Sequence, residues 1–336
     1  MTASESALEA SGETTREGRG WLRAAGNGRP KQRPTPAGSD DRRSNREGGL
    51  LVAPAVALLL AMTVFPAIYL VHASLFDFTL LGSSRRFVGL DNYVEVLTNG
   101  ILRSSLLRTL GFVVVAVGVE LFIGMIIAVN LARRSVFNTV ASTLLLLPLA
   151  VTPAVSGLVF RQLLNPNFGW VDHYLESLGI IDRPVEWLSH PATAWTALIG
   201  LDVWQWTPFV ALILMAGLQA LPREPFDAAA VDGASRWQTF RFLTLPMLRP
   251  FIAIAVVLRV IQAFKTFDSF KVLTDGGPGD STEIVNLMIH RVALQSFRVG
   301  DAAALGVVFL IIVSLVAPLI LRVSWGSVNA SAEERS

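Results

Sequence analysis

The chain has no cysteine and only three lysines among its 336 residues. Without cysteine it has no disulfide framework, no thiolate metal site and no cysteine nucleophile. Charged residues are also sparse, at 16% of the sequence, and the net charge is only +2. No lysine follows a glycine, because all three come after proline or phenylalanine. A nucleotide-hydrolysing P-loop, which needs a Gly-Lys pair around the phosphates, is therefore absent.

Other catalytic patterns are missing too. The four histidines form no HxxxH pair, and no G-x-S-x-G elbow occurs. Nothing assembles into an active site, so the sequence predicts a protein that is not an enzyme. We expect no catalytic residue, no metal site and no cofactor in this chain.

Apolar residues, by contrast, make up 52% of the chain and cluster into long runs. A helix needs about 20 apolar residues to cross the hydrocarbon of a bilayer. The pattern predicts an all-α fold, a polytopic membrane bundle of six transmembrane helices. Pro148 and Pro153 in the third helix remove backbone donors and predict a kink there. The expected helices are about 50–73, 106–131, 137–160, 194–220, 250–270 and 302–321.

The flanking segments have a different composition. Residues 1–48 are rich in Gly, Ser, Pro, Arg and Glu and predict a disordered basic tail, while 326–336 form a short tail after the membrane domain at 49–325. With the first tail inside, the inner segments hold 17 Lys and Arg and the outer segments hold 7. By the positive-inside rule, both termini and the loop at 221–249 are then cytoplasmic.

The loop at 221–249 carries the most informative motif. Pro225 is well placed to begin a short helix through Val231, and Gly233 permits a sharp change of direction. A second amphipathic segment follows, and we expect Leu245-Pro246 to stop it before the fifth transmembrane helix. Small alanines would allow a partner to approach closely. The loop is thus either a docking element or an ordinary amphipathic connector.

This segment resembles the EAA loop of binding-protein-dependent ABC importer permeases. The family pattern is Glu-Ala-Ala, three residues, Gly, nine residues and Ile-x-Leu-Pro, and this chain has Asp for Glu and Leu for Ile. The resemblance implies the MetI-like permease fold and a coupling helix that fits a cleft in a separate ATPase subunit. The matching positions are Asp227, Ala228, Ala229, Gly233, Leu243, Leu245 and Pro246.

Three further stretches are similar to the sugar-permease branch of that family. They are Phe87–Tyr93, Asp202–Phe209, and Phe267-Asp268 with Leu273–Gly279. The Gly-Gly-Pro-Gly run at 276–279 lacks the strand and lysine of a phosphate loop, and the charge count places it outside, so we expect an external turn. A permease for another solute such as glycerol phosphate, and a stand-alone ion-driven transporter, are the alternatives.

The resemblance also implies partners and a location. It implies a sugar substrate, a second permease subunit, two ATP-binding cassette ATPase subunits and an external solute-binding protein, with no nucleic acid. ATP and magnesium would bind to the ATPase partner, and the chain would lie among the lipids of a bacterial cytoplasmic membrane.

Polar residues inside apolar helices predict a translocation path. Ionisable groups at membrane depth are costly and usually face a bundle interior or a water-filled cavity. Tryptophan rings could pack on the C–H faces of a sugar. Lys265 and Asp268 could instead pair along one helix, and Glu120 could be a polar packing contact. The path candidates are Asp202, Trp204, Trp206, Arg259, Gln262, Lys265 and Asp268.

Overall fold

The computed structural model describes residues 40–79, 82, 85–98, 100–132 and 135–333. The chain divides into two units, Met1–Ala61 and Met62–Ser336, and helix α1 (Asp40–Ser74) contributes to both. The start of α1 at Asp40 corrects the prediction of an unstructured tail as far as residue 48. Helix propagation is cooperative, so an apolar helix extends into flanking polar residues at little cost. Residues 1–39 of the predicted tail lie outside the described residues.

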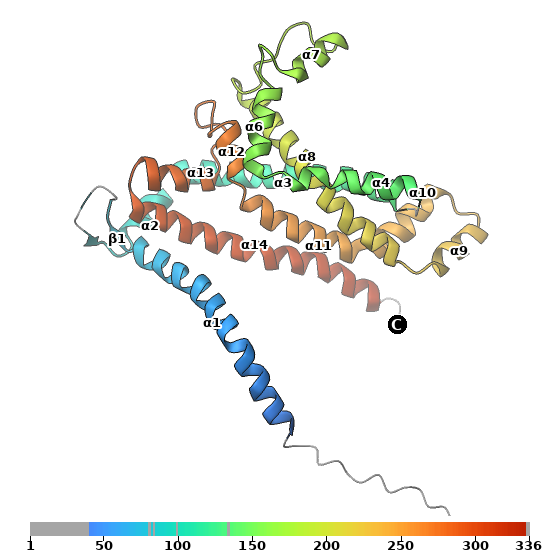
Figure 1. The fold of residues 1–336 in the computed structure, drawn as a ribbon, viewed down its shortest axis with the longest axis horizontal. Helices are drawn as coiled ribbons and strands as arrows, with labels where there is room; N and C mark the ends of the chain where they lie inside the picture. The colour runs from blue at the N-terminus through green and yellow to red at the C-terminus, as the bar shows by residue number, and fades with distance from the viewer. Residues whose placement is uncertain (1–39, 80–81, 83–84, 99, 133–134, 334–336) are drawn as a thin grey trace, which may run out of the picture. The chain divides into compact units, whose positions relative to one another are not determined.

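The second unit is almost entirely helical (Figure 1). A small antiparallel hairpin of β1 (Phe76–Asp77) and β2 (Arg86–Phe87), with Phe76 opposite Phe87, follows α1. The helices after it are α2 (Asp91–Thr98), α3 (Gly100–Leu131), α4 (Val136–Leu145), α5 (Leu147–Ala150), α6 (Pro153–Leu163), α7 (Trp170–Ser177), α8 (Pro191–Ala220), α9 (Glu224–Val231), α10 (Arg236–Thr239), the π-helix η1 (Phe240–Thr244), α11 (Leu245–Phe264), α12 (Asp268–Leu273), α13 (Val285–His290), the π-helix η2 (Arg291–Gln295) and α14 (Val299–Glu333).

The described residues hold five helical segments long and apolar enough to cross a membrane, and a bent helix pair that counts as a sixth. The bent pair joins Val136–Ala150 to Pro153–Leu163 at 95°. The fold class predicted from the sequence, an all-α bundle of six membrane helices, is thus confirmed with one span strongly bent. The five unbroken spans are Val52–Ser74, Gly100–Leu131, Pro191–Ala220, Arg236–Phe264 and Val299–Val316.

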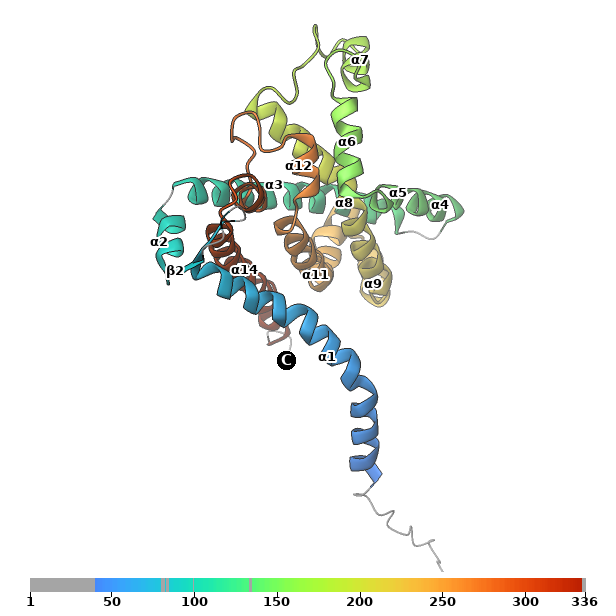
Figure 2. The same ribbon diagram turned by 60° about the vertical axis from the view of Figure 1, so that its left-hand side comes forward.

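The bend follows from one of the two prolines in the third predicted helix. Pro153 has no N–H to donate back along the helix, and Val151 before it is extended, with ψ 132°. The Gln205 side chain on α8 donates to the freed Val151 carbonyl at 2.7 Å and so supports the break. Pro148 lies in the first turn of α5, where a proline is tolerated. Beyond the bend, α6 packs beside α12 (Figure 2).

The fifth membrane helix differs from its prediction at both ends. Leu245-Pro246 does not stop the preceding segment, because the helical path continues from α10 through η1 into α11. In the wide turn of η1 the Leu245 N–H bonds to the Phe240 carbonyl, and the helix continues through Pro246, the second residue of α11, although proline has no N–H to donate. The helix ends at Phe264 instead of residue 270, and α12 starts after a short turn.

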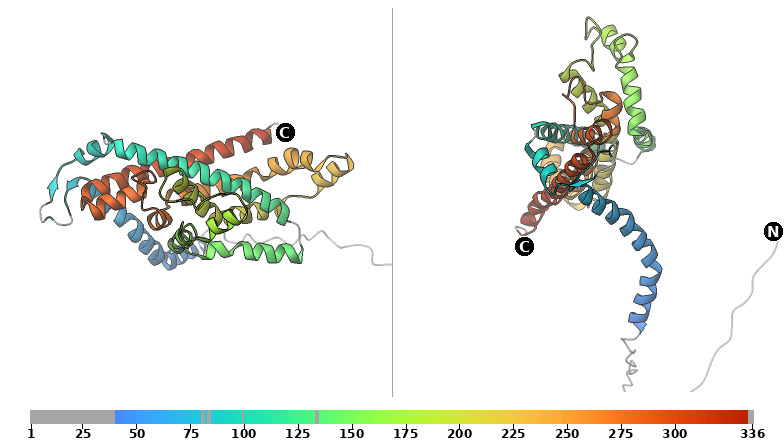
Figure 3. Two further views of the ribbon diagram at one scale, coloured as in Figure 1. Left: turned by 90° about the horizontal axis from the view of Figure 1, so that it is seen from above. Right: turned by 90° about the vertical axis from the view of Figure 1, so that its left-hand side faces the viewer.

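The last helix also runs beyond its predicted limits of 302 and 321. α14 continues to Glu333 and so includes residues 326–333 of the predicted tail. α11 packs against α14 and against α3, whereas α3 and α14 cross in the view from above (Figure 3, left). α3 packs closely on α8 at Gly124, where an added side chain would meet Val210 at 2.9 Å.

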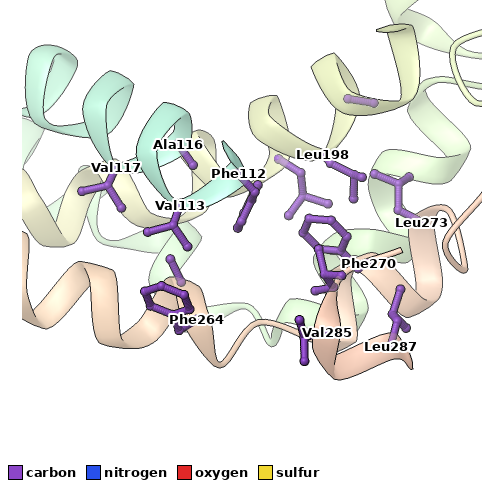
Figure 4. Close-up of a cluster of buried hydrophobic side chains, with 14 of the residues drawn as sticks. Phe112, Val113, Ala116, Val117, Leu198, Phe264, Phe270, Leu273, Val285 and Leu287 are labelled. Atoms are coloured by element: carbon purple, nitrogen blue, oxygen red, sulfur yellow. The ribbon is translucent and has the colours of Figure 1, made fainter. Parts of the chain in front are cut away.

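The main apolar core lies where α3, α8 and α11 meet the short helices α12 and α13. Phe112 and Phe270 contact edge to face there, with ring centroids 4.8 Å apart. Figure 4 shows these rings with Phe264 and Val285 in one cluster. This core fixes α12 against the membrane helices, and Phe267, which packs on the core, also lines the cavity described next.

Candidate functional site

A polar cavity of about 280 Å³ lies between α8, the end of α11 and the start of α12. We call it the central cavity. Its walls combine two carboxylates, two cationic groups, an amide, two hydroxyls and two aromatic rings. The lining residues are Pro153, Asp202, Trp206, Arg259, Gln262, Lys265, Thr266, Phe267, Asp268 and Ser269.

One wall is held by a buried ion-pair cluster that joins three helices. Arg259 on α11 forms an ion pair with Glu120 on α3: its Nε lies 2.6 Å from Oε2, and its Nη2 donates to Oε1 at 2.8 Å. The same Nη2 also pairs with the Asp202 carboxylate on α8. All three side chains are buried, and a buried charge is tolerated only when it is well paired. The cluster therefore fixes where α3, α8 and α11 stand relative to one another at this depth.

Aromatic and amide groups complete the wall. The Arg259 guanidinium lies over the Trp206 ring, 5.1 Å from its centroid, which adds a cation–π contact. The Gln262 Oε1 atom is buried and has no hydrogen-bond partner in the described part of the chain. An unpaired buried acceptor carries a desolvation cost that a bound donor would remove. The cavity thus offers a ring face and an unused acceptor.

Six of the seven path candidates line this cavity. The exception is Trp204, which is 43% exposed and packs on Phe160 instead, with ring centroids 5.5 Å apart. Lys265 and Asp268 do not pair in the described residues; both are exposed, one at the end of α11 and the other at the start of α12. Glu120 is the polar contact between helices that the sequence left open.

Sequence reasoning missed Thr266, Ser269 and Gln205. Thr266 lies in the turn after α11 and Ser269 in the first turn of α12, within a stretch that was predicted as continuous helix. A usable signal existed for Gln205, because residues three and four positions apart share one helix face. On α8 that rule groups Asp202 with Gln205 and Trp206 and sets Trp204 apart.

The second candidate region is formed by α9, α10 and η1, residues 224–244, which we call the docking segment. Pro225 lies in the first turn of α9, and Gly233 adopts φ +73° at the turn between α9 and α10. Ser235 caps α10 in a reciprocal capping box with Gln238. The segment is therefore well formed without help from elsewhere in the chain (Figure 1).

Large apolar side chains on the docking segment are left open. Val231, Trp237 and Phe242 are exposed by 87%, 65% and 68%. Among the EAA-type positions, Asp227, Ala228, Gly233 and Leu245 are exposed, while Ala229, Leu243 and Pro246 are half-buried.

The docking segment joins the bundle through two helices that also line the central cavity. α8 leads into it and α11 leaves it. The two helices touch just above the segment, where a side chain at Gly217 would meet Phe251 at 2.5 Å and Leu248 at 2.8 Å. A hollow of about 580 Å³, lined partly by Leu218, Phe226 and Asp227, lies between α9 and the bundle. α9 is thus connected to the cavity walls without being packed tightly against them.

A multi-pass helical bundle with a polar cavity between its spans is the architecture of a membrane transporter. The family model described as "Binding-protein-dependent transport system inner membrane component" matches residues 120–324. The chain belongs to this family and is a permease subunit of an ABC importer.

Two relatives and one solved structure illustrate the match. The chain is 38% identical to "Probable ABC transporter permease protein y4oQ" of Sinorhizobium fredii, over 82% of this chain and 90% of that one. It is 34% identical to the trehalose/maltose transport system permease protein of Thermococcus litoralis, over 77% and 86%. A bacterial ABC transporter involved in alginate import has the same fold, with TM-score 0.73 and 20% identity, over 85% of this chain and 97% of that one.

Proposed function

We propose that this permease carries a sugar, and that the central cavity holds the sugar during translocation. Sugar hydroxyls donate and accept hydrogen bonds, and sugar C–H faces pack on aromatic rings. The cavity supplies both, through the open Gln262 Oε1 acceptor and the Trp206 ring. The trehalose/maltose permease of Thermococcus litoralis, which is similar over most of both chains, supports the same substrate class.

The energy for transport comes from a partner in this proposal. The docking segment fits a cleft in an ATPase subunit, which binds ATP and magnesium, so the permease itself is neither an enzyme nor a cofactor carrier. The exposed side chains of Val231, Trp237 and Phe242 support this assignment, because large apolar groups on a well-formed segment are typical of an interaction surface.

The full assembly then contains this chain, a second permease subunit, two ATPase subunits and an external solute-binding protein. The chain's termini and docking segment face the cytoplasm, and the excess of Lys and Arg in those segments supports this orientation. ATP binding moves the docking segment, and α8 and α11 transmit the motion to the cavity walls. Alternating access is then a two-state equilibrium biased by the ATPase.

Uptake assays on cavity variants test the substrate proposal. In vesicles containing the co-purified assembly, Trp206→Ala and Gln262→Ala should each lower ATP-dependent uptake of labelled trehalose or maltose at least tenfold. Trp204→Ala, on the other face of α8, is the matched control and should retain uptake. Equal losses in all three variants would remove the cavity from the path. Uptake without ATP would favour an ion-driven transporter.

A further inference from the structure

An apolar groove separate from the central cavity runs along one side of α3 and the first turns of α8. It encloses about 420 Å³. All but one of its lining side chains are apolar, and the exception is Arg108. The groove is bounded by Leu107, Gly111 and Val115 on α3, by Trp195 and Ile199 on α8, and by Arg108.

The shape of the groove suits a single extended chain. Leu107, Gly111 and Val115 are four residues apart and so follow one helix face for about 12 Å. Gly111 leaves the floor open, because a Cβ there would meet no atom within 4 Å. Trp195 forms a fixed wall, since its indole N–H donates to the Ser281 carbonyl at 3.1 Å. The groove is thus built into the fold and left empty by the chain's own side chains.

The charge at one end suits an anion. Within the described residues, Arg108 takes part in no hydrogen bond or ion pair. Arg108 acts electrostatically on Glu283, but that carboxylate is already paired with Arg291, whose Nη1 lies 3.0 Å from Oε1. Burial raises the pKa of Glu283 despite the opposing effects of Arg291 and Arg108. Arg108 is therefore a cation without a carboxylate partner of its own in the described residues.

The position of this charge along α3 gives the groove a direction. Arg108 lies nearer the start of the helix at Gly100, whereas Val115 lies deeper in the apolar span. Arg108 lies near the end of the span, and the apolar groove runs from it toward the middle of the span. This arrangement is complementary to a phospholipid, which has a charged headgroup and an apolar acyl chain. A guanidinium forms charge-assisted hydrogen bonds to a phosphate, so Arg108 is placed to hold the headgroup of such a lipid.

We propose that the groove binds one anionic phospholipid. Its acyl chain lies along Gly111 and Val115 against the Trp195 wall, and its headgroup phosphate pairs with Arg108. A helix of the second permease subunit is the competing occupant, but it would have to supply an acid to match Arg108.

Lipid titration of the purified assembly tests the charge. The full-length chain, with the subunits that co-purify, is titrated in detergent with phosphatidylglycerol or with phosphatidylcholine of the same acyl chains, and bound lipid is counted by native mass spectrometry. Phosphatidylglycerol should bind more tightly. Arg108→Gln should weaken it about tenfold, as expected for the loss of a charge-assisted hydrogen bond. Arg183→Gln, at an exposed loop position, should leave it unchanged.

A second pair of variants tests the groove itself. Gly111→Leu fills the floor, and Gly118→Leu adds the same side chain to the same helix at another open position. Only Gly111→Leu should abolish binding of phosphatidylglycerol, with the assembly intact. Unchanged lipid binding in Arg108→Gln or Gly111→Leu overturns the proposal. Loss of the second permease subunit in Gly111→Leu, with lipid binding retained, would make the groove a subunit interface instead.

Discussion

The central cavity and the docking segment differ in whether their large side chains have partners within this chain. At the cavity, Arg259 is buried and paired with Glu120 and Asp202, all within this chain. At the docking segment, Trp237 and Phe242 are largely exposed although α10 begins with a reciprocal capping box. The first region is held together by the permease alone. The second binds a surface of another protein in our proposal, so substitutions in the two regions should affect different measurements.

The largest effect on the stability of the chain is expected at the ion-pair cluster. Arg259→Met leaves two buried carboxylates without their cation, and breaking a buried pair in this way costs about 3–5 kcal/mol. The variant should unfold at a clearly lower denaturant concentration or temperature in detergent. Lys265→Met is the control, because Lys265 is exposed and outside the ion pairs of the described residues; it should change stability by less than about 0.5 kcal/mol. Similar losses in both would contradict a structural role for the cluster.

A smaller loss is expected where α8 meets α11, between the two regions. Gly217→Val would drive a side chain into Phe251 and Leu248, and overpacking of this kind costs about 1–3 kcal/mol. Gly200→Val makes the same change in the same helix at a position with open space around it. The free energy of unfolding should fall only for Gly217→Val. ATP-dependent uptake should fall too, because the two helices that connect the docking segment to the cavity no longer fit together.

A substitution in the turn of the docking segment should show that co-purification of the ATPase can be lost independently of the stability of the chain. Gly233→Val places a branched side chain at φ +73°, at a cost of about 1–2 kcal/mol for a left-handed residue. Gly179→Val introduces the same strain at φ +68°, outside both regions. The two variants should lose similar stability, but only Gly233→Val should also lose co-purification of the ATPase, because its turn sets the angle between α9 and α10. Equal ATPase recovery would contradict the docking assignment.

The two regions also differ in how well the sequence predicted them. The docking segment is local: Pro225, Gly233 and Ser235 act on their own neighbours, so its helices and turn can be derived from short-range rules. The predicted helix stop at Leu245-Pro246 was wrong because a π-helix comes before it, and no residue pattern in the sequence indicated the wide turn of that π-helix.

The sequence predicted most residues of the central cavity, but it did not predict how they are arranged in space. Polar side chains in apolar runs marked Asp202, Arg259 and Gln262. Which of them meet depends on the ends of α11 and α12, and those ends are set by packing on the aromatic core instead of by local propensity. For the same reason Trp204 was included by sequence proximity, although it lies on the opposite face of α8 from the cavity.

The smallest effect on stability, and the clearest test of the comparison, is expected at Trp237. Its side chain is 65% exposed, so Trp237→Ser should change the free energy of unfolding by no more than about 0.5 kcal/mol. A tryptophan buried at the centre of an interface, however, contributes about 2 kcal/mol or more to binding, which is roughly a 30-fold loss of affinity. Trp170→Ser is the matched control, since Trp170 is 66% exposed but lies in α7. Both chains should unfold like the unmodified permease, and only Trp237→Ser should fail to retain the ATPase on purification. If both variants retain it equally, the exposed apolar side chains of the docking segment are not its binding surface, and the contrast between the two regions would be one of exposure alone.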